Sequence, residues 1–173
     1  IGVRLVGSEM CIRDSNYTAS TRLILKQCGL SDEDIDNRLI KVHGEASNND
    51  IIFGVEDNAG IKKEHVFLRK AYNIKYKALN FSELYDRIKS VAIFGHSLGE
   101  TDHTYFNKLF QESCMYNKFS TNNNKEFWLF YYKENGYHCM MQQLDSLTHN
   151  SLTSFRQYNR VNFINTDKEK VFI

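Results

Sequence analysis

A serine flanked by two glycines is the feature of this 173-residue chain best suited to chemistry. The turn Gly95-His96-Ser97-Leu98-Gly99 directly follows Val91 to Phe94, an apolar run, half of it β-branched, that predicts a strand buried in a parallel sheet. Thr101 is expected to cap the helix that follows, with Asp102 at its positive end. Because open α/β sheets bind ligands where a strand, a glycine turn and a helix N-terminus meet, the segment predicts a ligand site.

One interpretation of this turn is a nucleophile elbow. Gly-x-Ser-x-Gly is the pattern of α/β-hydrolases, with Ser97 as nucleophile and Asp145 and His149 following in the required chain order. However, Asp145 and His149 lie only four residues apart, on or near one helix, whereas triads usually draw them from separate loops. Glu100 is also bulky where those folds need a small residue. The serine esterase is therefore kept as an alternative.

A second interpretation is a nucleotide-binding turn. The Gly95-His96-Ser97-Leu98 turn is similar to the Gly-x-Ser-Leu turn of sirtuin-like NAD domains, in which the serine and the neighbouring backbone hold the cofactor. A third, purely structural interpretation is that the Ser97 hydroxyl only caps the turn.

Composition restricts the class of protein. Hydrophobic residues make up 42% of the chain and charged residues 25%, as in ordinary globular domains, and the length allows one domain or part of a larger one. The net charge of +1 does not indicate a nucleic-acid surface. No apolar run approaches the ~20 residues of a bilayer span, and residues 1–15 lack the apolar core of a signal peptide. We expect a cytoplasmic protein with no membrane partner.

The four cysteines and the absence of metal-ligand spacing argue against a metal site. Cys11, Cys28, Cys114 and Cys139 lie far apart with no C-x-x-C pair, so we expect buried, reduced thiols rather than a zinc site or a disulfide framework. His96 and His103 flank the predicted helix start without metal-ligand spacing, and a solvated or capping role is expected for them.

The first fifteen residues form a separate case. Leu5 to Ser15 resembles a translated transposase adapter from sequencing libraries. This resemblance implies that residues 1–15 are a non-native segment and that 16–173 are the C-terminal portion of a single domain truncated at its N-terminus. We therefore predict that Ile1 to Ser15 pack poorly and form no part of a site.

The remaining chain alternates helices and strands, which predicts an α/β fold with a largely parallel sheet and flanking helices. Strands are expected over 38–43, 51–55, 91–94, 127–132 and 160–165, and helices from Thr18 or Ser20 to Cys28, after Ser31, and from Asn80, Thr101, Asn135 and Ser151. The helix after Thr101 should bury Tyr105, Phe106, Leu109 and Phe110, which form one apolar stripe.

Several motifs together resemble one family. Asn16-Tyr17-Thr18, Val42-His43-Gly44, Ile52 to Asp57 and Ile93 to His103 look like the bacteriophage abortive-infection AbiH family, over nearly all of 16–173. The resemblance implies a Rossmann-like, sirtuin-like fold and a role in bacterial anti-phage defence. It also implies that the protein acts through NAD binding or hydrolysis.

The resemblance also implies roles for individual residues. Asn16 would hold the water or ribose near the nicotinamide–ribose bond, and His43 would be the general base, since imidazole titrates near neutral pH. The cofactor-binding residues would be Gly44, Gly95, His96, Ser97, Leu98 and Asp102, with NAD as the ligand or substrate and no metal.

Departures from the family pattern leave alternatives open. Thr18 stands where many sirtuin-like NADases have Asp, and the four-cysteine zinc module of deacylating sirtuins is absent. The glycine-rich unit that cradles the pyrophosphate would lie upstream of Asn16, so we expect the chain as given to bind NAD poorly or not at all. Enzymatic activity is left open, and a non-catalytic phage-sensing domain is the third candidate. The alternative for His43 is a structural histidine at the end of a strand. The nucleotide hypothesis requires His43 and Ser97 to face the same cavity.

Overall fold

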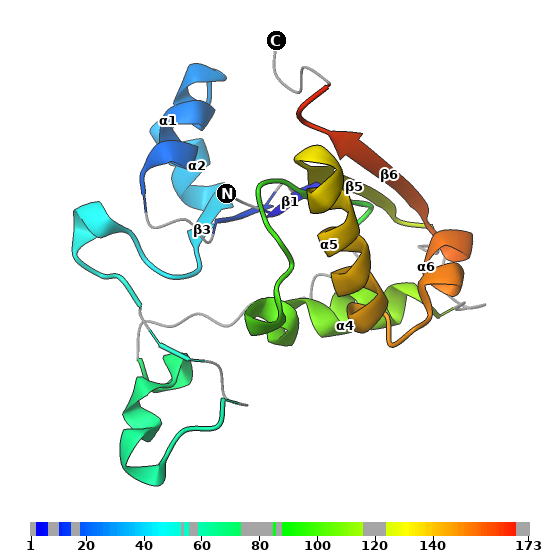
Figure 1. The fold of residues 1–173 in the computed structure, drawn as a ribbon. Helices are drawn as coiled ribbons and strands as arrows, with labels where there is room; N and C mark the ends of the chain where they lie inside the picture. The colour runs from blue at the N-terminus through cyan, green and yellow to red at the C-terminus, as the bar shows by residue number, and fades with distance from the viewer. Residues whose placement is uncertain are drawn as a thin grey trace. The chain divides into compact units, whose positions relative to one another are not determined.

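The structure is a computed structural model, and it describes residues 3–6, 11–14, 18–52, 54–55, 59–73, 85, 88–115 and 124–168. The chain forms two compact units (Figure 1). The first contains Ile1–Gly2 and Cys11–Leu79, and the second contains Val3–Met10 and Asn80–Ile173.

The second unit is built on a parallel sheet. Strands β4 (Ser90–Ile93), β5 (Glu126–Tyr131) and β6 (Arg160–Asn165) run parallel in this order. Strand β1 (Val3–Val6) pairs antiparallel with the other side of β4. The predicted α/β class, with a largely parallel sheet and flanking helices in the Rossmann-like manner, is confirmed.

Three helices cover one face of this sheet: α4 (His103–Ser113), α5 (Lys133–Leu147) and α6 (Leu152–Tyr158). A short 3-10 helix, η5 (Glu100–Asp102), precedes α4. Phe127 of β5 packs against Phe110 of α4 and Phe155 of α6, with ring centroids 5.6 and 4.8 Å away. The apolar stripe predicted for α4 is confirmed, because Tyr105, Phe106, Leu109 and Phe110 are all buried.

A buried lysine supports this core. Lys125, directly before β5, is 1% exposed, and its ammonium group donates hydrogen bonds to the carbonyl oxygens of Tyr85 (2.6 Å) and Ile88 (2.8 Å). The same ammonium lies 3.9 Å from the centre of the Tyr85 ring. Desolvation of the cation is thus offset by two carbonyl dipoles and an aromatic face.

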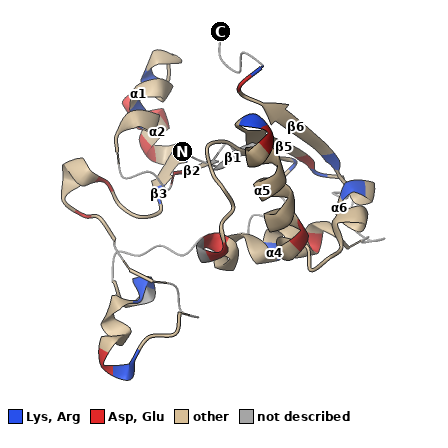
Figure 2. Cartoon of the chain, viewed as in Figure 1, with Lys and Arg blue, Asp and Glu red and all other residues tan. Residues whose placement is uncertain are grey.

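The first unit pairs two strands with two helices. Strand β2 (Cys11–Asp14) runs parallel to β3 (Leu39–Lys41). Helices α1 (Ser20–Gln27) and α2 (Asp32–Arg38) are joined through Gly29, whose φ of 85° provides the left-handed C-terminal turn. The charged residues of α1 are basic and those of α2 are mainly acidic (Figure 2), and Arg22 of α1 forms ion pairs with Asp32 and Asp36 of α2. The unit continues through the 3-10 helices η1 (Ala46–Asn48), η2 (Lys63–Leu68) and η3 (Lys70–Tyr72).

Most predicted elements are found, with helix starts displaced. Ser31 caps α2 as expected, its hydroxyl accepting the Asp34 amide at 3.1 Å, and Ser151 is the N-cap of α6. Neither Thr18 nor Ser20 caps α1, and α4 begins at His103 rather than at Thr101 because the 3-10 turn intervenes. The helix predicted from Asn80 falls mainly outside the described residues.

The strand predicted over 51–55 is wrong. Of the described residues in that range, only Val55 forms a bridge, with Arg69, and Ile52 instead donates its amide to the His43 carbonyl at 2.9 Å. Position 54 is also held too closely for a side chain, since a β-carbon there would lie 2.5 Å from the Leu68 carbonyl oxygen. The backbone of this segment therefore pairs with loops.

The prediction that residues 1–15 pack poorly is also wrong for the part of this segment that the structure describes. Val3–Val6 and Cys11–Asp14 are strands, and within the second of these Ile12 and Asp14 are 6% and 0% exposed. Pairing with β3 places the Asp14 carboxylate 2.8 Å from the Lys41 ammonium, which accounts for its burial. The division into an adapter-derived segment and a native 16–173 stays a prediction.

Candidate functional site

The His43–Gly44 turn ends β3 and is held by a close backbone approach. Gly44 has a φ of 73°, and a β-carbon there would lie 2.2 Å from the Asp50 carbonyl oxygen. The Asp50 carboxylate in turn accepts the Glu45 amide at 2.8 Å. His43, the preceding residue, is buried at 6% exposure. Only glycine fits at position 44 without a shift of the backbone.

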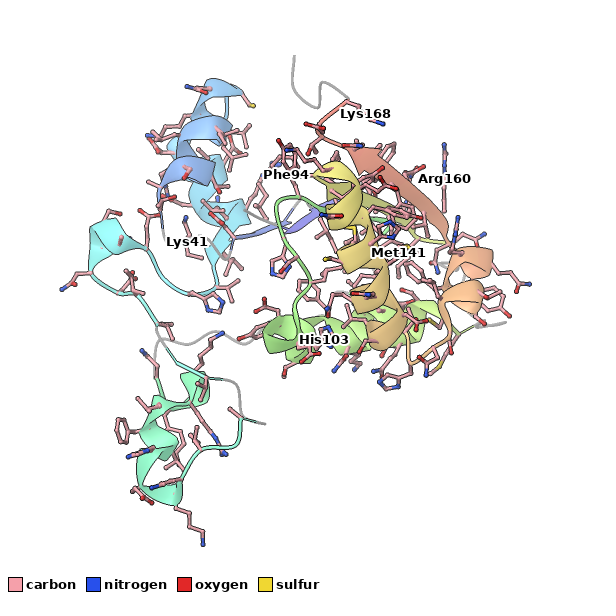
Figure 3. The ribbon with its side chains drawn as sticks, in the orientation of Figure 1. Lys41, Phe94, His103, Met141, Arg160 and Lys168 are labelled. Carbon is pink, nitrogen blue, oxygen red and sulfur yellow. The ribbon has the colours of Figure 1, made fainter. Side chains whose placement is uncertain are left out.

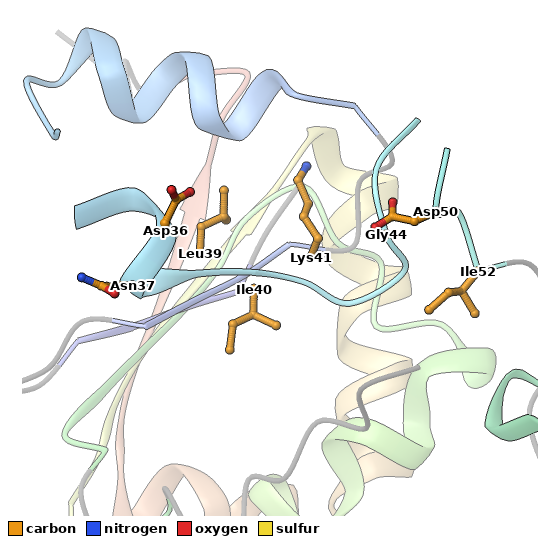
Figure 4. A pocket seen from close by; sticks show the side chains of 8 residues that line it. All are labelled: Asp36, Asn37, Leu39, Ile40, Lys41, Gly44, Asp50 and Ile52. Atoms are coloured by element: carbon orange, nitrogen blue, oxygen red, sulfur yellow. The ribbon is translucent and has the colours of Figure 1, made fainter. Parts of the chain in front are cut away.

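A cavity lies beside this turn, within the first unit (Figure 4). Its volume is about 580 Å³, in the range of small-molecule sites. Ile40 and Lys41 point to opposite sides of β3, as expected for neighbouring strand residues. The lining residues are Asp36, Asn37, Leu39, Ile40, Lys41, Gly44, Asp50 and Ile52.

Lys41 lines this cavity, and its ammonium group already forms ion pairs with carboxylates. Its ammonium lies 2.8 Å from the Asp14 carboxylate and 3.5 Å from that of Glu45, and it also donates to the Thr18 carbonyl. Its side chain is 14% exposed and Asp14 is 0% exposed. Because two carboxylates neutralise the ammonium, we expect hydrogen-bonding groups rather than Lys41 alone to contact an anion here.

The Gly95–Gly99 turn follows β4 in the second unit. Gly95 and Leu98 have φ of 64° and 54°, and both are left-handed. The Leu98 side chain is fully buried, whereas Ser97 is exposed. A branched-chain residue in this conformation carries strain of about 1–3 kcal/mol, which persists only where the surroundings impose it.

Two histidines bond the backbone of Leu98. The Leu98 amide donates to His96 Nδ1 at 2.9 Å, and His103 Nε2 lies 3.1 Å from the Leu98 carbonyl oxygen and 2.8 Å from Gln143 Oε1. Figure 3 shows His103 at the start of α4. His103 brings α4 and α5 together at this turn, because Gln143 belongs to α5.

The His96 side chain is 11% exposed, and this burial determines its charge. Burial lowers its pKa from the usual 6.5, and the nearby Asp102 carboxylate, 3.4 Å from Nε2, opposes this with a smaller effect. Its ring also meets the Phe106 ring edge-on at 5.3 Å. Neutral His96 therefore accepts through Nδ1 and presents a protonated Nε2 to Asp102.

The residues of the alternative triad are placed differently. His149 Nε2 bonds the Gln111 side-chain amide at 3.0 Å, and among the described residues no hydrogen bond joins His149 to Ser97 or to Asp145. Asp145 and Ser97 are both exposed.

The predicted site residues fall into two groups. His43 and Gly44 belong to the first unit, whereas Gly95, His96, Ser97, Leu98 and Asp102 belong to the second, and Asn16 lies outside the described residues. His43 and Ser97 belong to different units, and the prediction that they face one cavity stays a prediction. In the described residues, no three His, Cys, Asp or Glu side chains are gathered as metal ligands. The described helices also include none long and apolar enough to cross a bilayer.

Sequence reasoning missed two features of the site. Asp50, whose carbonyl defines the Gly44 position, follows three polar residues in a loop that shows no periodic signal. His103 was expected to be solvated or to cap the helix, whereas its ring reaches back to Leu98 and across to Gln143. Its position in the first turn of a helix after a glycine loop was the available signal.

Comparison with known proteins gives one result. The family model described as "Bacteriophage abortive infection AbiH" matches residues 5–132. No curated protein and no solved structure matches the chain. The family match covers most of the chain, including both turns, and the chain therefore belongs to the bacteriophage abortive infection AbiH family.

Proposed function

We propose that this AbiH-family chain serves anti-phage defence by binding NAD at the His43–Gly44 and Gly95–Leu98 turns. The observation that carries the proposal is the turn at Gly44. There a left-handed glycine lies against the Asp50 carbonyl and borders a cavity of about 580 Å³. Support also comes from topology, because each turn follows a strand of a parallel pair. The first turn follows β3, which runs parallel to β2, and the second follows β4, which runs parallel to β5. Ligands of open α/β sheets bind at such strand ends.

The chemistry we propose is hydrolysis of the bond between nicotinamide and ribose. His43 would accept a proton from water as the water oxygen bonds to the anomeric carbon of the ribose. The carbon–nitrogen bond breaks with its electron pair passing to nicotinamide, and the products are nicotinamide and ADP-ribose. His43 is buried, an imidazole is the usual general base in such reactions, and Asn16 would orient the water.

An exposed serine at a strand end favours a second candidate, the serine esterase. Ser97 is exposed in the turn that follows β4, and a nucleophile elbow likewise exposes its hydroxyl in the turn after a strand. In such an elbow the strained residue is the nucleophile itself, whereas here the left-handed residue is Leu98. The geometry thus favours a binding turn over a nucleophile.

The test is an NAD assay with two histidine variants. Isothermal titration of NAD and chromatographic detection of nicotinamide would compare the wild type with His43→Asn and His138→Asn, since His138 lies on the exposed side of α5, 66% exposed. A relative that carries the expected upstream glycine-rich unit should be assayed in parallel. We expect His43→Asn alone to lose binding and turnover. Labelling of Ser97 by a fluorophosphonate, with no effect of His43→Asn on NAD, would support the esterase instead.

A further inference from the structure

The exposed position of Ser97 depends on how the residue after it is held. Leu98 is the one residue of the turn that is both fully buried and left-handed, with 0% exposure and a φ of 54°. Its side chain fixes the turn to the core, and its backbone conformation sets where Ser97 and Gly99 lie. Whatever stabilises the Leu98 backbone therefore positions the Ser97 hydroxyl.

Both polar groups of the Leu98 backbone are bonded by imidazoles. The amide donates to His96 Nδ1 at 2.9 Å, so Nδ1 must lack a proton. The carbonyl oxygen and Gln143 Oε1 both face His103 Nε2, at 3.1 and 2.8 Å, so His103 must carry its proton on Nε2. The two histidines thus provide partners for the amide and the carbonyl of a fully buried residue.

Each histidine is itself held by the surrounding elements. His96 Nε2 faces the Asp102 carboxylate of η5 at 3.4 Å, and its ring packs against Phe106 of α4. His103 is anchored by Gln143 of α5. The tautomers that bond Leu98 are therefore those that the neighbouring helices favour.

We propose that His96 and His103 are positioning residues that clamp the Leu98 backbone and so present Ser97 at the end of β4 to the bound nucleotide. This inference rests on the proposed NAD-binding function and extends it. His96 acts through Leu98 rather than by touching the nucleotide, which differs from the cofactor-contacting role that the family resemblance implies for it. His103 has no role in that resemblance.

The clamp can be tested first in the wild-type chain without ligand. Long-range proton–nitrogen correlation spectra report which ring nitrogen of each histidine carries the proton. We expect the proton on Nε2 in both, with His96 Nδ1 unprotonated at neutral pH. A proton on His96 Nδ1 or an unprotonated His103 Nε2 would overturn the clamp, and this readout needs no variant to fold.

Matched variants then separate positioning from packing. His96→Asn keeps an acceptor close to the Nδ1 position, and His103→Gln keeps a donor close to the Nε2 position, whereas His96→Ala and His103→Ala keep neither. We expect Leu98 amide exchange to quicken about tenfold in His96→Ala, the factor that one hydrogen bond gives, and to stay near wild type in His96→Asn and in His138→Asn. Equal exchange in His96→Ala and the wild type, or equally fast exchange in His96→Asn and His96→Ala, would contradict the clamp.

NAD titration distinguishes failure of the clamp from failure of the proposed function. With the clamp and the function both correct, NAD affinity falls about tenfold in His96→Ala and His103→Ala and recovers in His96→Asn and His103→Gln. Absence of NAD binding both in the wild type and in the relative that carries the upstream glycine-rich unit, with the expected exchange pattern, overturns the proposed function and the presentation of Ser97 to a nucleotide. Unchanged NAD affinity in both alanine variants overturns the positioning role alone.

Discussion

The two turns of the candidate site are held by different means. At Gly44 a missing side chain makes the conformation possible, because the Asp50 carbonyl occupies the space where a β-carbon would be. At Leu98 a side chain is present and buried, and two imidazoles bond the backbone on either side. The first turn therefore depends on the absence of a β-carbon, and the second on hydrogen bonds to two imidazoles. Substitution of the glycine should disrupt the first turn, whereas protonation of His96 should weaken the second.

The largest effect is expected for Gly44→Ala. The new β-carbon would lie 2.2 Å from a backbone oxygen at a φ of 73°, so the loop must move. We expect a loss of about 3 kcal/mol or more in the free energy of unfolding, measured by urea denaturation. Gly29→Ala is the matched control, because Gly29 has a φ of 85° with nothing within 4 Å of an added β-carbon. It should lose only about 1–2 kcal/mol, and equal losses would show that strain rather than contact governs Gly44.

Leu98→Ala tests the other turn at its buried side chain. Removing a fully buried leucine should lower the free energy of unfolding by about 2–5 kcal/mol, as a cavity replaces packed atoms. Leu98→Gly would also relieve the left-handed strain, yet lose the same side chain. Urea denaturation should find the glycine variant no less stable than the alanine variant. A clearly less stable glycine variant would argue against strain at this position.

A smaller loss is expected when one bond of the clamp is removed. His96→Ala leaves the Leu98 amide without its acceptor, and we expect a loss of about 1–2 kcal/mol, with His96→Asn losing less. The comparison is made by thermal and urea unfolding at pH 7.5. If both variants lose the same amount, ring packing against Phe106 rather than the hydrogen bond is what His96 contributes.

The smallest effect is the pH dependence of the second turn. Burial lowers the pKa of His96, so below the ordinary value of 6.5 the unfolded chain binds a proton that the folded chain does not. Stability from this group is therefore complete above about pH 6.5 and is lost as the pH falls through the folded pKa. We expect the free energy of unfolding to fall from pH 7 to pH 5 more steeply in the wild type than in His96→Asn. Identical slopes would show that His96 does not titrate differently on folding.

Periodic segments were predicted from the sequence, and local close approaches were not. The apolar stripe of α4 and the runs that form β4, β5 and β6 are repeated patterns in which each residue supports the same assignment. The 51–55 segment has the composition of a strand, yet its backbone pairs with loops because Gly54 lies against Leu68. Tertiary contact outweighs β-propensity there.

The candidate site shows the same division. The glycines of both turns stand out in the sequence, because left-handed backbone and close approach favour glycine. The residues that contact these turns do not stand out in the sequence. Asp50 approaches Gly44, and His103 approaches Leu98 and Gln143, only after folding. The burial of Asp14 also escaped prediction, because its ion pair with Lys41 depends on the register of β2 against β3.

The proposal to test is that NAD binds at the two turns. The most direct test is to titrate NAD into isotopically labelled protein while following the backbone amides of Gly44 and Ser97 by NMR. We predict that both signals shift as NAD is added, with the weak affinity expected of the chain as given. A turn whose signal does not respond at the highest NAD concentration would contradict NAD binding at that turn.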